Sequence, residues 1–345
     1  MKLYRTLTLL VAVSMMLAVP PAYMNQAMAA PATKDATTPA PTGKIILYTS
    51  VPQDIVDRLQ SDYKAKFPAS TLEVFRAGSS EVEAKMAAEK QAGSIQADLV
   101  WVAEPSTYED FKAQGILLKF APAEASVLPA EMKDKDGTYY AGRLINMVVA
   151  FNIKANPKPA SWKDLLNSAY KGKLGFPTPA SSGAAEAAVR TLADTQGFGW
   201  DYFKQFRANG GKQIKNNSAV QEQLSTGELL VGALLDFMMR DAKAKGSPVD
   251  YAWPTEGAVF IPSPIAVIKT SKNPEAAKAF VDYLLSKDGQ ASMVKLGNFI
   301  PVRSDVPGPA GTPALGQIKR LTTDWRTVRE KRQDTKDQFE AIFSK

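Results

Sequence analysis

LGFPTPASSGAAE, residues 174–186, joins a short apolar strand candidate to the start of an alanine-rich helix through a turn that holds two serine hydroxyls and a glycine. The first N–H groups of a helix are unpaired, the helix dipole is positive there, and a glycine lets a ligand approach the backbone. We therefore expect an oxyanion to bind at this turn, to Ser181, Ser182, Gly183 and Ala184. Ordinary N-capping is the alternative interpretation of the same residues.

Two more turns of this kind follow strand candidates earlier in the chain. In the turn RAGSS, Ser79 and Ser80 open a helix, and Arg76 offers a guanidinium fork that can bind an anion. Ser50 follows the first strand candidate and also precedes a helix. The alternatives are a surface charge for Arg76 and a plain N-cap for Ser50.

Strand and helix candidates alternate from residue 44 onward. The apolar runs at residues 45–49, 72–75 and 97–102 are typical of strands, and each precedes a segment with apolar residues at helical spacing. This βαβαβα order predicts an α/β fold with a parallel sheet covered by helices. Ligands bind beyond the carboxyl ends of such strands. We therefore expect one cleft lined by the turns at Ser50, Arg76 to Ser80, Glu104, Ser181 to Gly183, and Asp236-Phe237.

Two longer runs do not fit a simple repeat of that unit. RLINMVVAFN, residues 143–152, and AVFIPSPIAVI, residues 258–268, are long extended segments. The two prolines of the second run restrict it to an edge or a crossing strand. Elsewhere the pattern predicts a helix that starts at Ser161 and a charged helix over residues 317–343.

The composition excludes several kinds of chemistry. The chain contains no histidine and no cysteine, so it cannot form a Ser–His or Cys–His catalytic pair, a disulfide, or a zinc site with the usual ligands. We expect no metal and no other cofactor. The remaining enzymatic alternative is a secreted hydrolase with paired carboxylates, for which the candidates are Glu81 with Glu83 or Asp236 with Asp241.

The first 29 residues have the features of a cleaved signal peptide. Lys2 and Arg5 flank the start of an apolar run at residues 7–19, and Ala27-Met28-Ala29 matches a cleavage site. Because there is no cysteine for a lipid anchor, we expect a freely soluble periplasmic protein that begins with a flexible lead-in, residues 30–43. Removal of the signal lowers the net charge from +7 to +5. No basic block is typical of a nucleic-acid-binding arm.

Taken in order, the motifs of the chain resemble those of one family. They are ILYTSVPQ, FRAGSS, ADLVWVAEP, YYAGRLINMVVAFN, PASSGAAEA, NNSAVQEQLSTGE, LLDFMM and NFIPVR. Over residues 44–303 the chain is similar to the periplasmic solute-binding proteins of ABC importers, in the type II subgroup that binds ferric ion, phosphonates or sugar phosphates. The resemblance implies a monomer whose two α/β lobes close on a small solute and deliver it to an inner-membrane permease.

The resemblance also implies where the lobes lie. Two crossing strands, near residues 146–152 and 259–266, would join them. Lobe 1 would then be discontinuous, with residues 44–147 and 263–310, lobe 2 would hold residues 148–262, and residues 311–345 would form a helical tail. Lobe 1 would offer Ser50, Arg76, Ser79 and Ser80 to the solute, and lobe 2 would offer Ser181 to Ala184, Asn217 and Asp236.

The chain departs from the iron-binding members of that subgroup. They carry a histidine or similar ligand on the first loop, and two tyrosines where Phe237 and Met238 stand here. Ferric iron needs hard oxygen ligands, which neither residue offers. We therefore expect a small solute that carries its own phosphate, phosphonate or carboxylate. Ferric ion held with a synergistic anion is the alternative.

Three residues are site candidates because they match positions of the family. We expect Asn217 to donate to the anion, Asp236 to accept from an amine or hydroxyl of the solute, and Phe237 to form a wall of the pocket. The alternatives are helix capping for Asn217 and Asp236, and core packing for Phe237. A sensor that partners a membrane receptor would use the same binding chemistry.

Overall fold

Parallel strands form the N-terminal part of the sheet. The computed structural model describes residues 41–344, and β1 (Gly43–Thr49) lies between β2 (Ser70–Arg76) and β3 (Leu99–Trp101), parallel to both. Each strand leads into a helix: α1 (Gln53–Lys66), α2 (Ser79–Gln91) and α3 (Pro105–Ala113). The predicted βαβαβα unit is therefore confirmed. The predicted signal peptide, residues 1–29, and most of the predicted lead-in lie outside the described residues.

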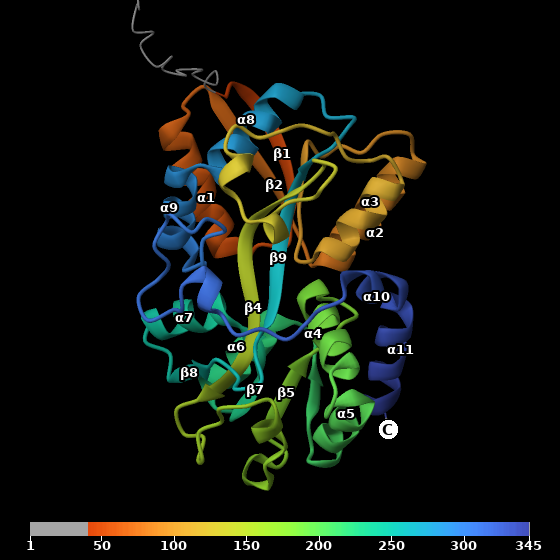
Figure 1. Ribbon diagram of the computed structural model, residues 1–345, viewed down its shortest axis with the longest axis vertical. Coiled ribbons are helices and arrows are strands. Elements are labelled where there is room, and N and C mark those ends of the chain that lie inside the picture. The colour runs from red at the N-terminus through yellow and green to blue at the C-terminus, as the bar shows by residue number, and fades with distance from the viewer. Residues whose placement is uncertain (1–40, 345) are drawn as a thin grey trace, which may run out of the picture. The chain divides into compact units, whose positions relative to one another are not determined.

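Two long antiparallel strands run through the middle of the sheet (Figure 1). β4 (Tyr140–Asn152) and β9 (Val259–Val267) pair with each other along much of their length. β9 also pairs with β3, whereas β4 also pairs with β7 (Val231–Leu235), so the two strands join the two halves of the sheet. They are the two crossing strands that the sequence predicted, and β9 contains both prolines.

The second half of the sheet repeats the parallel arrangement. β5 (Leu174–Pro177) lies between β6 (Lys212–Ile214) and β7, parallel to both, and β8 (Val249–Ala252) pairs with the far end of β4. The helices of this half are α4 (Gly183–Asp194), α5 (Gly199–Ala208), α6 (Asn217–Thr226) and α7 (Asp236–Ala244). The expected fold class, two α/β lobes joined by two crossing strands, is therefore confirmed.

Burial explains why the central strands have continuous apolar runs. Every residue of β4, β7 and β9 is buried, as expected for strands that are covered on both faces by helices. β5 is also fully buried, and the turn that holds Ser181 and Ser182 connects its carboxyl end to α4. In residues 41–344 no helix combines the length and the apolar character that a bilayer span requires.

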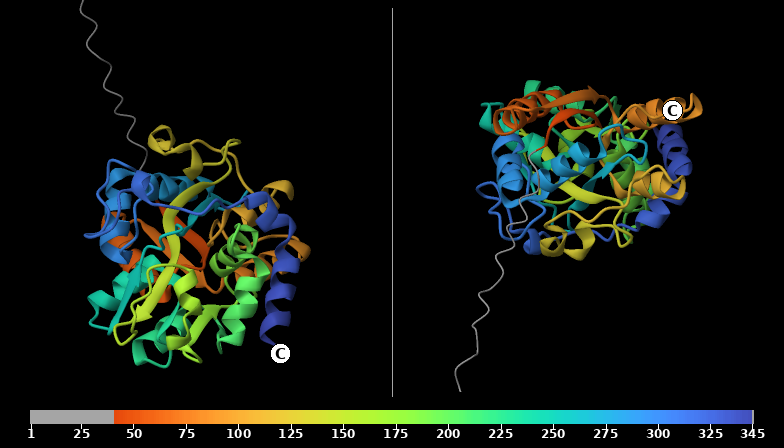
Figure 2. Two further views of the ribbon diagram at one scale, coloured as in Figure 1. Left: turned by 60° about the horizontal axis from the view of Figure 1, so that its bottom comes forward. Right: turned by 90° about the horizontal axis from the view of Figure 1, so that it is seen from above.

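The C-terminal segment differs from the prediction of one helix over residues 317–343. After α8 (Pro274–Leu285) and α9 (Lys287–Gly297), the helical tail begins only with α10 (Trp325–Glu330) and continues as α11 (Arg332–Phe343). Asp324 explains the late start, because its carboxylate caps α10 by accepting bonds from two first-turn N–H groups. α10 packs against α3 and α4, and α11 packs against α4 and α5 (Figures 1 and 2).

The helix predicted to start at Ser161 is also shorter than expected. Its place is taken by two 3₁₀ segments, η3 (Lys163–Leu166) and η4 (Ser168–Tyr170). Ser161 Oγ accepts a bond of 3.1 Å from Asp164 N, as a capping residue does. Asn167 then accepts from Ala169 N and starts a new turn after four residues, so no regular α-helix develops.

Candidate functional site

One cavity of about 130 Å³ lies where loops from both halves of the sheet meet. Most of the predicted site residues line it: Ser50, Arg76, Ser79, Ser181, Ser182, Ala184, Asn217 and Phe237. The first three follow β1 or β2, and the others belong to the turns and helices that follow β5, β6 and β7. The tertiary structure thus brings together loops that are separated by up to 187 residues, as the rule for the carboxyl ends of parallel strands predicts.

The N-terminus of α4 presents unused hydrogen-bond donors to this cavity. Ser182 is the N-cap, and its Oγ accepts from Ala185 N at 3.2 Å and from Asn217 Nδ2 at 2.9 Å. A hydroxyl has two lone pairs and one proton, so Ser182 has its own proton left to donate. No hydrogen bond within residues 41–344 engages the N–H groups of Gly183 and Ala184. The N-cap alternative is therefore confirmed for Ser182, and the same turn keeps the donors that the predicted anion would need.

Arg143 places a buried cation at the wall of the cavity. It lies in the first third of β4, is 2% exposed and lines the cavity. Its Nε donates to Ser263 Oγ at 3.1 Å, but its Nη1 is buried and has no partner within the described residues. Burial lowers the pKa of Arg143 to about 9, and the group remains a cation at neutral pH.

Aromatic rings, rather than a carboxylate, surround this guanidinium. Its central carbon lies 5.2 to 5.7 Å from the ring centroids of Trp101, Phe237 and Phe299. Cation–π contacts stabilise the charge only in part, and an isolated buried charge is costly. A cation in such surroundings, in a residue that lines a cavity and has an unpartnered donor, is suited to an anionic partner.

Two further buried polar atoms at the cavity lack a partner within residues 41–344. They are Ser50 Oγ and Asn217 Oδ1. Buried polar atoms are nearly always hydrogen-bonded, so each such exception calls for an explanation. The amide oxygen of Asn217 can only accept, and it therefore suits a solute group that donates, such as an ammonium or a hydroxyl.

The two lobes touch at the rim of the cavity. A Cβ atom on Gly78, just before α2, would lie 2.8 Å from the carbonyl oxygen of Ser181. Only a glycine allows this approach of the two backbones without displacement. Glu81 binds Gly78 N through Oε2 at 3.1 Å, and Arg76 donates from Nε to Val51 O at 3.2 Å.

Three predicted residues do not line the cavity: Ser80, Gly183 and Asp236. Asp236 is fully buried inside its lobe, where its carboxylate accepts from Asn146 N at 2.9 Å and from Arg240 Nη2 at 2.8 Å. It is the first residue of α7 and points to β4 instead of the cavity. Gly183 lies against the carboxyl group of Glu104, which also does not line the cavity.

The capping alternatives are decided by neighbouring residues. Asn216, not Asn217, is the N-cap of α6 and accepts from Ala219 N at 2.9 Å. The residues at the N-cap positions of α1 and α7 are Pro52 and Leu235, so neither Ser50 nor Asp236 holds that position. Phe237 is 1% exposed and packs on Phe299 with ring centroids 4.5 Å apart, so it is both a core residue and a wall of the cavity.

Sequence reasoning missed several residues that line the cavity. Arg143 is the most important of them, and the others include Glu81, Ile145, Lys215, Asn216, Ser218 and Met238. A signal for Arg143 was present, since it is the single charged residue of the strand run at residues 140–152. Lys215, Asn216 and Ser218, which lie around the start of α6, had no such signal in the sequence.

The paired carboxylates that the hydrolase alternative needs each bind a different partner. Glu81 caps α2, whereas Glu83 pairs with Arg332 at 3.1 Å. Asp241 pairs with Lys245 at 2.6 Å, whereas Asp236 pairs with Arg240. Within residues 41–344 no group of three or more acidic, histidine or cysteine side chains is arranged to hold a metal ion.

The sequence is similar to those of known proteins. The family model of the bacterial extracellular solute-binding proteins matches residues 95–331. A protein of Salmonella typhimurium named "Putative 2-aminoethylphosphonate-binding periplasmic protein" is 26% identical over 288 residues, which is 79% of this chain and 82% of that one.

Solved structures show the same fold. The periplasmic binding protein AfuA of Actinobacillus pleuropneumoniae, with fructose-6-phosphate bound, has a TM-score of 0.78 at 22% identity, and the match covers 88% of this chain and 99% of that one. Iron-bound HitA of Pseudomonas aeruginosa has a TM-score of 0.74 at 20% identity, over 88% and 99%.

Proposed function

The chain belongs to the bacterial extracellular solute-binding proteins, and we propose that it captures a small solute with a phosphonate, phosphate-ester or other oxyanion head group. The cleft binds this solute without transforming it, and a membrane ABC permease then receives it. The protein acts as a monomer in the periplasm, where it is released by signal cleavage and carries no lipid anchor. The relatives with periplasmic names support this location.

Arg143 is the observation that carries the anionic part of this proposal. A guanidinium that is 2% exposed, has no carboxylate partner, keeps an unpartnered donor and belongs to a residue lining a cavity is stabilised by a bound anion. Ala184, whose N–H is free, lines the same cavity at the start of α4, where the helix dipole favours negative charge. Together they offer a cation on one side of the head group and oriented backbone donors on the other.

The remaining cavity residues favour a small solute with a donor group besides its anion. A cavity of about 150 Å³ holds a ligand the size of benzene, and the cavity here measures about 130 Å³. A short aminoalkylphosphonate is small enough for such a volume. The unpartnered Asn217 Oδ1 would accept from its ammonium group.

Closure of the two lobes on the solute is the mechanism that the geometry supports. Ser50, Arg76 and Ser79 approach the cavity from one side, whereas Ser182, Ala184 and Asn217 approach it from the other. A solute that binds both sets favours the closed arrangement, because only closure offers all the donors at once. We assign residues 44–147 and 263–310 to lobe 1, residues 148–262 to lobe 2, and residues 311–345 to the tail.

Thermal-shift and calorimetric titration of the mature protein test this function. The ligands are 2-aminoethylphosphonate, inorganic phosphate, fructose 6-phosphate and ferric citrate, each also incubated with the protein and analysed for products. We expect the phosphonate to raise the melting temperature as a ligand that binds only the native state does, with no product formed. Stabilisation by the ferric complex alone would support the iron-binding alternative, and turnover of any ligand would support the hydrolase.

A further inference from the structure

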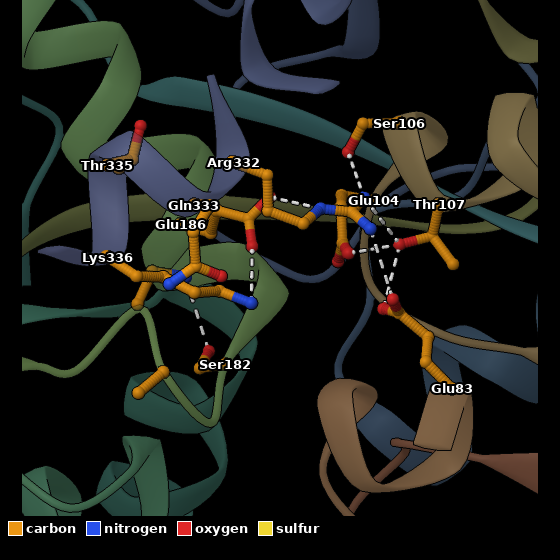
Figure 3. A network of polar contacts seen from close by, with 12 residues as sticks. Glu83, Glu104, Ser106, Thr107, Ser182, Glu186, Arg332, Gln333, Thr335 and Lys336 are labelled. Atoms are coloured by element: carbon orange, nitrogen blue, oxygen red, sulfur yellow. Dashed lines mark hydrogen bonds and ion pairs between the residues drawn. The ribbon is translucent and has the colours of Figure 1, made fainter. Parts of the chain in front are cut away.

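A chain of polar groups runs behind the anion-binding turn and joins both lobes to the tail (Figure 3). Glu104, which lies between β3 and α3, contacts Thr107 Oγ1 through Oε1 at 2.7 Å. The same hydroxyl contacts Glu83 Oε1 of α2 at 2.9 Å and accepts from Arg332 Nη2 of α11 at 3.1 Å. Arg332 in turn pairs with Glu186 of α4 at 3.0 Å.

The hydrogen count at Thr107 favours a proton on one of two carboxyl groups. A hydroxyl has a single proton to donate, so Thr107 can donate either to Glu83 or to Glu104, but not to both. The second contact is then a hydrogen bond only if that carboxyl is protonated and donates to Thr107 Oγ1. The distances of 2.7 and 2.9 Å are both those of good hydrogen bonds between oxygens.

Glu104 is the member of the pair that is suited to carry the proton. It is 1% exposed, its Oε2 has no partner within the described residues, and no cation is bonded to it. Glu83, in contrast, pairs with Arg332 at 3.1 Å. Burial, together with the charges of Glu83 and Glu186, raises the pKa of Glu104 to about 8.

Glu104 also touches the turn that binds the anion. A Cβ on Gly183, the first residue of α4, would lie 1.6 Å from Glu104 Oε2, so the carboxyl group lies directly against this helix start. An ionised carboxylate there would compete with a bound anion for the positive end of the helix and would repel it. A neutral carboxyl group leaves the helix start to the solute.

We propose that Glu104 is a proton-binding positioning residue, and that capture of the anion at the α4 turn is coupled to uptake of a proton by this carboxyl group. The coupling rests on the proposed function. It is reciprocal, because a bound anion disfavours the ionised carboxylate by the same free energy with which the proton favours the anion. Deprotonation of Glu104 would then weaken binding without touching the solute directly.

Charged groups of four elements face Glu104 and set this equilibrium. Two further carboxylates and one arginine act on it directly, and the other two groups act through their ion pairs with Arg332 or with Glu186. They are Glu83 of α2, Asp110 of α3, Glu186 of α4, and Arg332 and Lys336 of α11. The acidic groups favour the proton, and the two basic groups of the tail oppose it.

Thermal unfolding without any ligand tests the proton itself. In the folded protein the pKa of Glu104 lies above the ordinary value of 4.5. The unfolded chain therefore releases this proton as the pH rises above 4.5, whereas the native state keeps it up to about pH 8. The melting temperature of the wild type should therefore fall, across this window, relative to that of Glu104→Gln, which is a neutral isostere. Glu109 lies on α3, which directly follows Glu104, and is bonded to Tyr139; Glu109→Gln is the control and should follow the wild type. Parallel curves for all three proteins would overturn the proposal.

Calorimetry in buffers of different ionisation enthalpy tests the coupling, with 2-aminoethylphosphonate as the ligand. At pH 8 the wild type should take up as much as about half a proton per ligand more than Glu104→Gln does, since a group with this pKa is then half protonated. The ligand's own ionisation contributes equally to both proteins, so it cancels when the proton uptake of one is subtracted from that of the other. Equal uptake by both would overturn the coupling while leaving the proposed function intact. Failure of every anion to bind would overturn the proposed function, and the unfolding curves would still report on the proton.

Discussion

Asn217 Nδ2 donates a hydrogen bond of 2.9 Å to Ser182 Oγ, so the first residue of α6 holds the N-cap of α4 in place. This bond joins two turns that follow neighbouring strands, β5 and β6. It uses a lone pair of the serine and leaves the serine proton for a ligand. The start of α4 is thus oriented before any solute arrives, and preorganised donors of this kind increase affinity.

Substitution Ser182→Asp tests the role of the α4 turn. Aspartate is as good an N-cap as serine, so the fold should persist, whereas its charge should oppose an anion by several kcal/mol. We expect affinity for 2-aminoethylphosphonate to fall by about 100-fold or more, measured by calorimetry, with an unchanged circular dichroism spectrum. Ser286→Asp, at the N-cap of α9, is the matched control and should bind normally. Retained affinity in Ser182→Asp would place the site elsewhere.

Substitution Arg143→Met tests the buried cation. Methionine keeps much of the apolar volume but removes the charge-assisted bond to the anion, which is worth roughly 1.5–3 kcal/mol. Affinity should fall by about 10- to 150-fold. The melting temperature of the ligand-free protein should change little or rise, because an unpaired buried charge is removed. Arg326→Met, at an exposed position, controls for loss of net charge, and an equal loss of affinity in both variants would contradict the assignment.

Substitution Asn217→Ala tests the acceptor for the solute's donor group. The variant should discriminate less between 2-aminoethylphosphonate and ethylphosphonate, which differ by the ammonium. A hydrogen bond to a charged group contributes about 1.5 kcal/mol or more, so the preference for the amine should drop by about tenfold. Titration of both ligands into both proteins gives the coupling energy directly. An unchanged preference would show that another group recognises the amine.

Substitution Lys245→Gln tests an ion pair across the mouth of the cleft. Lys245 follows α7 and pairs with Asp54 of α1, in the other lobe, at 2.9 Å. Exposed pairs contribute about 0.2–1 kcal/mol, so we expect affinity to fall by at most about fivefold, and the difference should vanish at high salt. Lys243→Gln breaks a pair of the same length with Asp250 inside one lobe and should leave affinity unchanged. Identical effects of the two substitutions would argue against a role in closure.

Local sequence signals were sufficient for much of the fold. The strand at residues 45–49, the helices after it and the start of α4 were predicted because apolar periodicity and capping residues act over a few neighbouring positions. Two predicted helices were wrong in their extent, because a second local signal competed with the first one. Asp324 caps a new helix inside the predicted tail, and Asn167 interrupts the helix that Ser161 begins.

The sequence by itself determined which turns end the strands, and therefore that Ser50, Arg76, Ser79 and Ser182 would gather at one edge. Only the tertiary structure decided which charged side chains point into the cavity. Asp236 binds Arg240 inside its lobe, whereas Arg143, in a strand with no other charge, faces the cavity without a carboxylate. Glu104 and Arg332, which are 228 positions apart, meet near Thr107 only after the tail packs on α4. Local patterns act through nearest neighbours along the chain, whereas the partner of a buried charge is set by the packing of distant elements.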